Sequence, residues 1–290
     1  MKILLIGKTG QLGGDLLRNG AGHEIDAPGR DQLDVQSRSA IEATVAAGRY
    51  DCVINTAAFH DVPRCELEPE TAFRVNCVAV RDLAAACSRA GALLVTFSTD
   101  YVFGGAKRAP YAEDDPPSPL QIYGITRLAG EHAARATAQD AIVIRTCGLY
   151  GLSGARSKGG NFVDKRVQEA LAGAPVQMGN DQIVSPTCTD DLSKAVLRLI
   201  ERSDRSPGIY HLVNEGACSW YEFTKAIYEM MRFSTQLTPV DRGGRTGDMR
   251  RPRYSALQNT KAAALGITLP PWRDALDGYL RDKYGAQNRT

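Results

Sequence analysis

A tyrosine and an arginine stand four residues apart, at Tyr123 and Arg127, in a stretch from 123 to 136 that reads as a helix. Residues with this spacing project from one helix face, so the phenol and the guanidinium are expected to be neighbours. A cation beside a phenol stabilises the phenolate and lowers the tyrosine pKa, which makes Tyr123 a candidate proton donor. Such a pair on its own is more often surface packing, so other residues must support this interpretation.

Two hydroxyl groups follow an apolar run at 93–95, which reads as a strand. They belong to Ser98 and Thr99. In a doubly wound sheet, ligands bind in the crevice outside the carboxyl ends of the strands. The two hydroxyls are therefore expected to lie at that crevice.

Three glycines, Gly7, Gly10 and Gly13, follow an apolar run at 3–6 and open a helical stretch. Glycine permits a tight turn and lets the backbone approach a pyrophosphate, while the helix N-terminus offers unpaired N–H groups and partial positive charge. Their place directly after the first strand is the context that a dinucleotide site requires. A strand–helix turn without a ligand is the alternative.

The residue after the second strand normally selects the cofactor, because a carboxylate there bonds the ribose 2′-hydroxyl. This chain carries Pro28-Gly29-Arg30 at that place. Arg30 could pair with a 2′-phosphate, which favours NADPH, whereas Asp31 keeps NADH open. A solvated turn residue is an equally weighted interpretation of Arg30.

The elements that must position these residues alternate between buried strands and helices. Strands are expected at 3–6, 23–26, 52–54, 93–95, 141–144 and 209–213. Strands separated by helices imply right-handed βαβ units and a parallel sheet. The predicted fold class is therefore α/β: a Rossmann-type doubly wound parallel sheet with a smaller C-terminal substrate-binding lobe.

The second half of the chain is less regular, and it sets the predicted domain boundaries. A loop is expected at 151–160, and 242–253 has no periodicity. The dinucleotide-binding Rossmann domain is placed at 1–150 and 186–214. The substrate-binding lobe is placed at 151–185 and 215–290, so the two interleave in sequence.

Composition excludes several classes of protein. With 35 basic and 33 acidic residues the net charge is +2, which excludes a strongly basic nucleic-acid binder. No segment approaches the roughly 18 to 20 apolar residues that cross a bilayer. Seven scattered cysteines and four histidines show no metal-ligand spacing, so no metal site is expected. Reduced thiols and the lack of a signal-peptide pattern lead us to expect a cytoplasmic protein.

Further short motifs run in order over nearly the whole chain. They lie at 55–58, 66–70, 110–113, 130–131, 180–182, 186–187, 220–221, 250–252 and 255. By these residues the chain resembles the extended short-chain dehydrogenases/reductases, and within them the dTDP-4-dehydrorhamnose reductases. The resemblance implies reduction, with NADPH or NADH, of the C4 keto group of a nucleotide-linked 4-keto-6-deoxy sugar, most closely dTDP-4-dehydro-L-rhamnose.

The resemblance also implies roles for individual residues. Thr99 polarises the sugar carbonyl, Tyr123 donates the proton while nicotinamide delivers hydride, and residue 127 holds the nicotinamide ribose. The positions expected at the cofactor are Gly7, Gly10, Gln11, Leu12, Gly13, Arg30, Asp34, Val35, Ala57, Ala58, Phe59, Phe97, Tyr123 and Arg127. Those expected at the substrate are Thr99, Asp100, Gly148, Asn161, Gln182 and Arg251.

Four positions depart from the family pattern. The family has lysine where Arg127 stands; arginine keeps the charge, but its planar fork cannot reproduce a compact ammonium. Cys147-Gly148 replaces a frequent Ser-Trp pair, which suggests that an aromatic wall beside the sugar is lost. A glycine is usual within 183–185, and a lysine is usual at Arg64.

Two other functions remain open. A nucleotide-sugar epimerase or dehydratase on this scaffold would hold NAD tightly, so the purified protein would carry cofactor. A regulatory subunit of methionine adenosyltransferase resembles the same reductases, so a non-catalytic binding subunit is credible, and Arg127 adds to that possibility. The helices around 73–87 and 123–136 could form a homodimer, or their apolar faces could pack on the sheet.

Overall fold

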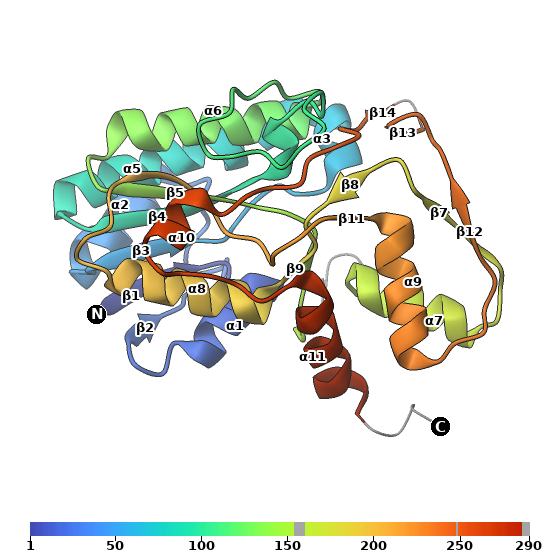
Figure 1. Cartoon of the computed structure of the whole chain (residues 1–290). Coiled ribbons are helices and arrows are strands. Elements are labelled where there is room, and N and C mark those ends of the chain that lie inside the picture. The colour runs from blue at the N-terminus through green and yellow to red at the C-terminus, as the bar shows by residue number, and fades with distance from the viewer. Residues whose placement is uncertain (154–159, 248, 286–290) are drawn as a thin grey trace.

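The computed structural model describes residues 1–153, 160–247 and 249–285, and its centre is a six-stranded parallel sheet (Figure 1). The strand order is β10-β5-β4-β3-β1-β2. These strands are β1 (Lys2–Ile6), β2 (Glu24–Asp26), β3 (Cys52–Asn55), β4 (Leu93–Thr99), β5 (Ala141–Thr146) and β10 (Gly208–His211). The chain passes from β1 to β2 on one side and returns to β3 on the other, so the topological switch point lies between β1 and β3. The predicted α/β class and Rossmann-type sheet are confirmed.

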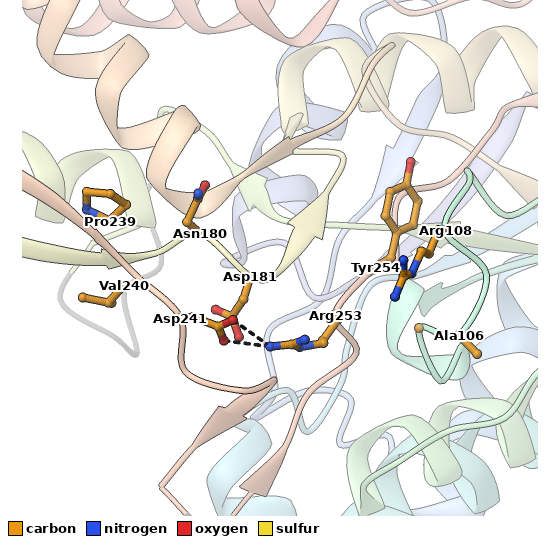
Figure 2. Close-up of a pocket in the computed structure, with 10 residues that line it drawn as sticks. Ala106, Arg108, Asn180, Asp181, Pro239, Val240, Asp241, Arg253 and Tyr254 are labelled. Atoms are coloured by element: carbon orange, nitrogen blue, oxygen red, sulfur yellow. Dashed lines mark hydrogen bonds and ion pairs between the residues drawn. The ribbon is translucent and has the colours of Figure 1, made fainter.

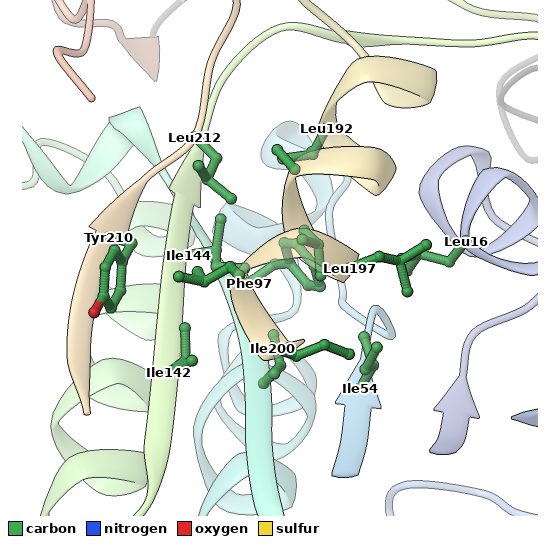
Figure 3. Close-up of a cluster of buried hydrophobic side chains, with 14 of the residues drawn as sticks. Leu16, Ile54, Phe97, Ile142, Ile144, Leu192, Leu197, Ile200, Tyr210 and Leu212 are labelled. Atoms are coloured by element: carbon green, nitrogen blue, oxygen red, sulfur yellow. The ribbon is translucent and has the colours of Figure 1, made fainter. Parts of the chain in front are cut away.

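Helices cover both faces of this sheet, as the apolar strands require. On one face lie α2 (Arg38–Gly48), α5 (Ala79–Ala90) and α6 (Ile122–Thr137), and on the other α1 (Gln11–Asn19) and α8 (Thr189–Glu201) (Figure 1). An apolar core lies on each face of the sheet. Figure 3 shows the core on the face covered by α1 and α8, where Ile142 and Ile144 of β5 and Phe97 of β4 contact Leu192 and Leu197 of α8. The two buried cores hold the strand ends, and therefore the crevice, in fixed positions.

The predicted helix over 73–87 is present in the structure, but it contains a π-helical turn. The chain forms α3 (Val62–Leu67), α4 (Pro69–Phe73) and a π-helical turn at Arg74–Val78 before α5. Within that turn Asn76 pairs with both backbone groups of Phe59 at 2.9 and 3.0 Å and donates to Thr126 of α6 at 3.1 Å. A Cβ at Gly130 would lie 2.1 Å from the carbonyl of Asn76, so only glycine allows α6 to approach so closely.

A second group of elements encloses its own apolar cluster beside the sheet (Figure 1). It contains α7 (Phe162–Leu171), β7 (Val176–Gly179), α9 (Trp220–Met231), β12 (Leu237–Val240) and α11 (Trp272–Tyr284). Short pieces complete the chain: β6 (Leu149–Tyr150), β8 (Ile183–Val184), β9 (Thr187–Cys188), β11 (Cys218–Ser219), β13 (Arg245–Thr246), β14 (Met249–Arg250) and α10 (Thr260–Ala264).

The details of this half differ from expectation at two points. The aperiodic stretch 242–253 contains the β13–β14 hairpin. Ala262, Ile267 and Leu269 pack in the core of the sheet although they belong to the segment assigned to the other lobe. Residues 154–159 of the predicted loop lie outside the described residues. The predicted domain boundaries themselves stay a prediction. In the parts of the chain that the structure describes, no helix is long and apolar enough to cross a membrane.

Candidate active site

A cavity of about 780 Å³ opens at the carboxyl ends of the sheet strands, between the sheet and helices α7 and α9. The predicted site residues that line it are Gly10, Gln11, Leu12, Gly13, Ala58, Phe97, Thr99, Asp100, Tyr123, Arg127, Gly148 and Asn161. Those that do not line it are Gly7, Arg30, Asp34, Val35, Ala57, Phe59, Gln182 and Arg251. The glycine turn, the hydroxyls and the Tyr–Arg pair, which are far apart in sequence, therefore meet at one place.

The three glycines of the turn differ in how much space a side chain would have at each position. Gly7 has a φ of +93°, and a Cβ there would lie 2.4 Å from Oγ1 of Thr56; a Cβ at Gly13 would lie 2.2 Å from the carbonyl of Gly7. These two positions must be glycine for the turn to close. Gly10 meets only the Gly7 carbonyl, at 3.4 Å, and is the N-cap of α1 with no side-chain cap and no acidic residue in the first turn. The N-terminus of α1 is therefore open to an anion.

Thr99 lines the cavity and contacts several polar neighbours. Its Oγ1 lies 3.0 Å from Oδ1 of Asp100, within hydrogen-bonding distance, and accepts from the backbone N–H of Tyr101 at 3.2 Å. The same hydroxyl is within hydrogen-bonding reach of Tyr123. Arg127 is buried, and its Nη2 donates to the carbonyl of Phe97 on β4. Its Nε has no hydrogen-bond partner among the described residues, so one N–H remains for a ligand.

The pKa of Tyr123 moves in the opposite direction to the sequence-based expectation. Burial raises it above its ordinary value, while Arg127 and the Thr99 hydroxyl act to lower it and Asp100 acts to raise it. The predicted lowering is therefore wrong in sign, because burial outweighs the neighbouring cation. A raised pKa keeps the phenol protonated at neutral pH, which is the state a proton donor needs.

A buried ion pair fixes the helix that carries Tyr123 and Arg127. Glu131, one turn beyond Arg127, accepts from Ser98 Oγ at 2.5 Å and from Arg145 Nε and Nη2 at 2.9 and 2.7 Å. Both side chains of this pair are 2% exposed. We call it the Glu131–Arg145 clamp, because it joins α6 to β4 and β5. Sequence reasoning missed it; the available signal was the spacing of 123, 127 and 131 on one helix face.

Part of the cavity wall is aromatic. Phe162 of α7 and Trp220 of α9 both line the cavity, with ring centroids 4.6 Å apart. Gly148 has a φ of +56°, and a Cβ there would lie 3.2 Å from Cη2 of Trp220. The indole therefore approaches the place where a side chain at 148 would begin. The aromatic wall that the Cys147-Gly148 change was expected to remove is supplied by these two rings, which the sequence-based site did not include.

Arg251 and Arg30 are two of the predicted residues that do not line the cavity. Arg251 donates to the hydroxyl of Tyr101, and Tyr101 itself lines the cavity. Arg30 is 80% exposed and lies 3.6 Å from Asp34, at the turn after β2. Arg251 is thus one side chain removed from a ligand in the cavity, and Arg30 is available to a group that extends along the sheet edge.

A second cleft, of about 610 Å³, lies among Ala106, Asn180 and Tyr254. Figure 2 shows Arg253 facing Asp241, to which it donates at 2.7 and 2.9 Å. This cleft contains neither the Ser98 and Thr99 hydroxyls nor the Tyr123–Arg127 pair, so the first cavity is the candidate active site. Among the described residues, no three His, Cys, Asp or Glu side chains gather where they could hold a metal ion.

Known proteins resemble this chain over nearly its full length. The family model described as the RmlD substrate binding domain matches residues 1–284. A spore coat polysaccharide biosynthesis protein, SpsK of Bacillus subtilis, is 37% identical over 287 residues, 98% of this chain and 99% of that protein. A dTDP-4-dehydrorhamnose reductase of Mycolicibacterium smegmatis is 36% identical over 290 residues, 98% and 86% of the two chains. The crystal structure of dTDP-4-dehydrorhamnose reductase from Bacillus anthracis in complex with NADP matches with a TM-score of 0.91 and 31% identity, covering 97% and 99%.

Proposed function

This chain belongs to the RmlD substrate binding domain family, which includes dTDP-4-dehydrorhamnose reductases, and on that premise we propose that it reduces the C4 keto group of a nucleotide-linked 4-keto-6-deoxy sugar with NADPH. The specific substrate we propose is dTDP-4-dehydro-L-rhamnose. The observation that supports the proposal best is the meeting of Thr99, Tyr123 and the glycine turn in one cavity.

The residues present fit a dinucleotide cofactor. The uncapped N-terminus of α1 offers its N–H groups to a pyrophosphate, with Gly10, Gln11 and Leu12 at the point of approach. The unpartnered Nε of Arg127 is suited to a ribose hydroxyl. When bound, the cofactor supplies the hydride. Phe97 and Thr99, at the end of β4, are the lining residues that would hold its nicotinamide end.

The side chains of this protein bind the sugar carbonyl, supply the proton and exclude water. Thr99 Oγ1 donates a hydrogen bond to the C4 oxygen, and Tyr123, kept protonated by its buried position, donates the proton. Arg127 holds its charge beside the phenolate that forms. Phe162 and Trp220 exclude water from the opposite side of the sugar.

A turnover assay tests this function directly. The purified protein is mixed with NADPH and a panel of nucleotide-linked 4-keto sugars, and the loss of nicotinamide absorbance is followed. We expect consumption of NADPH with dTDP-4-dehydro-L-rhamnose. Cofactor that co-purifies as NAD, with isomerised or dehydrated product and no net NADPH loss, would indicate the epimerase or dehydratase. NADPH binding without turnover on any sugar would indicate a binding subunit.

For cofactor choice, we expect NADPH to bind more tightly than NADH, and Arg30→Ala to narrow the difference. Arg30 is exposed, and its contact with Asp34 is loose enough to yield to a 2′-phosphate. Calorimetry with both cofactors measures this. Arg202→Ala, another exposed arginine paired with a neighbouring aspartate, serves as the control and should change neither affinity. Equal affinities of the wild-type protein for NADPH and NADH would contradict the assignment.

We also propose a homodimer and a cytoplasmic location. Leu67, Phe73 and Ile125 are exposed apolar side chains on α3, α4 and α6, three helices that pack on one another. Exposed apolar side chains on helices that pack together support an interaction site on this side of the molecule. Light scattering of the purified protein measures the oligomeric state.

The cytoplasmic location is proposed because a nucleotide-linked sugar and a nicotinamide cofactor are substrates that the cytoplasm supplies.

A further inference from the structure

Tyr123 must regain a proton after every turnover, and the neighbouring cation cannot supply it. The guanidinium of arginine does not lose a proton in proteins. Arg127 can therefore stabilise the tyrosinate, but it cannot return the proton that the substrate has taken. While the product still fills the cavity and keeps water from the phenol, only a neighbouring protein group can do so.

The contacts of Thr99 lead to such a group. Thr99 Oγ1 lies within hydrogen-bonding reach of Tyr123 on one side and 3.0 Å from Oδ1 of Asp100 on the other. Asp100 is 3% exposed, lines the cavity, and accepts from Ser255 Oγ at 2.6 Å through its other oxygen. A carboxyl, a hydroxyl and a phenol thus lie next to one another in the lining of the cavity.

Thr99 has a single hydroxyl proton, so the protonation state of Asp100 decides which group that proton is donated to. Its hydroxyl has one proton, and the Tyr101 N–H already occupies one of its lone pairs. If Asp100 is ionised, it accepts the Thr99 proton, and none remains for the substrate. If Asp100 is protonated, it donates to the second lone pair, and the Thr99 proton is free to point into the cavity. Only the acid form of Asp100 is compatible with the role of Thr99.

We propose that Asp100 is the proton source that recharges Tyr123 through the hydroxyl of Thr99. This inference rests on the proposed function. Tyr123 gives its proton to the C4 oxygen; the Thr99 O–H bond then breaks as a proton passes to the phenolate, and the Asp100 O–H proton passes to Thr99. No electrons are exchanged. Asp100 is left as carboxylate and recovers a proton from water, because it lines the open cavity.

The surroundings of Asp100 favour the acid form. Burial raises its pKa above the ordinary value, against the lowering effect of hydrogen bonds from Ser255, Cys147 and Thr99. The phenols of Tyr101 and Tyr123 also face it, and Arg251 and Arg127 act on those phenols. Since the protonated acid is the active state, turnover should fall as the pH rises through the pKa of Asp100.

Asp100→Asn separates orientation from proton supply. The amide can still donate to Thr99 and accept from Ser255, but it has no proton to transfer. Tyr123 begins protonated, so stopped-flow absorbance should show a first turnover at the wild-type rate. It should consume one NADPH per site and be followed by a steady state slower by roughly 10²- to 10⁴-fold. Asp15→Asn is the matched control: Asp15 is a buried carboxylate with a raised pKa that accepts from Thr189, outside the cavity. This control should show no such burst.

Each outcome of these experiments supports or overturns the role of Asp100 as proton source. If both phases slow together, or neither slows, Asp100 is not the proton source. If Asp100→Asn does not fold, Ser255→Ala replaces it: loss of a donor to the carboxylate raises the pKa of Asp100, so the alkaline decline of kcat should move to higher pH. An unmoved decline would overturn the relay. A wild-type protein that reduces no keto sugar would reject the proposed function itself, and the relay with it.

Discussion

Tyr123→Phe is expected to reduce turnover by roughly 10²- to 10⁴-fold, the usual contribution of a positioned general acid. The substitution removes one hydroxyl and keeps a ring of the same shape, which packs edge-on against Tyr101 at 6.2 Å between centroids. The geometry of the cavity should therefore survive. Steady-state kinetics should show the loss in kcat, and calorimetry should show unchanged binding of NADPH.

A matched control distinguishes chemistry from packing. Tyr150 is fully buried, and its hydroxyl has no hydrogen-bond partner among the described residues. Tyr150→Phe makes the same chemical change outside the cavity, and it should leave both turnover and cofactor binding unchanged. If Tyr123→Phe reduced the sugar as fast as wild type, the proton would have to come from another group, and the assignment of Tyr123 would fail.

The parts of the site that sequence alone predicted are those fixed by local patterns. Gly10 stands in a turn whose spacing and preceding strand define its task. Thr99 ends a run of apolar residues, and Tyr123 and Arg127 share a helix face because of their spacing. Each of these inferences needs only a few neighbouring residues and the rule that strand ends meet at one edge of a parallel sheet.

The parts that sequence could not predict depend on contacts between distant segments. The sign of the Tyr123 pKa shift follows from how much of the fold covers the phenol, which no spacing reveals. The π-helical turn before α5 accompanies the bonds of Asn76 to Phe59 and Thr126. The aromatic wall joins Phe162 to Trp220 across 58 positions of the chain, and only packing brings them together.

Glu131→Ala should lower the free energy of unfolding by about 3–5 kcal/mol, because it leaves the Arg145 guanidinium buried without its partner. Urea denaturation measures this loss. Glu42→Ala is the control: Glu42 also bonds two arginines, Arg38 and Arg89, but at the exposed surface, so its removal should change stability far less. A loss for Glu131→Ala no larger than for Glu42→Ala would show that the clamp does not stabilise the fold.

A second variant separates the stability of the clamp from its effect on the site. Replacing both partners, as Glu131→Leu with Arg145→Met, removes the buried charges together, and such double changes are often close to neutral in stability. The bond from Ser98 to Glu131 is nevertheless lost, and Ser98 precedes Thr99 at the end of β4. Small displacements of reacting groups are costly in rate, so this folded variant should bind NADPH yet turn over more slowly than wild type. If it keeps the wild-type kcat, the clamp contributes to folding alone, and the positions of Thr99 and Tyr123 are set by the surrounding apolar packing.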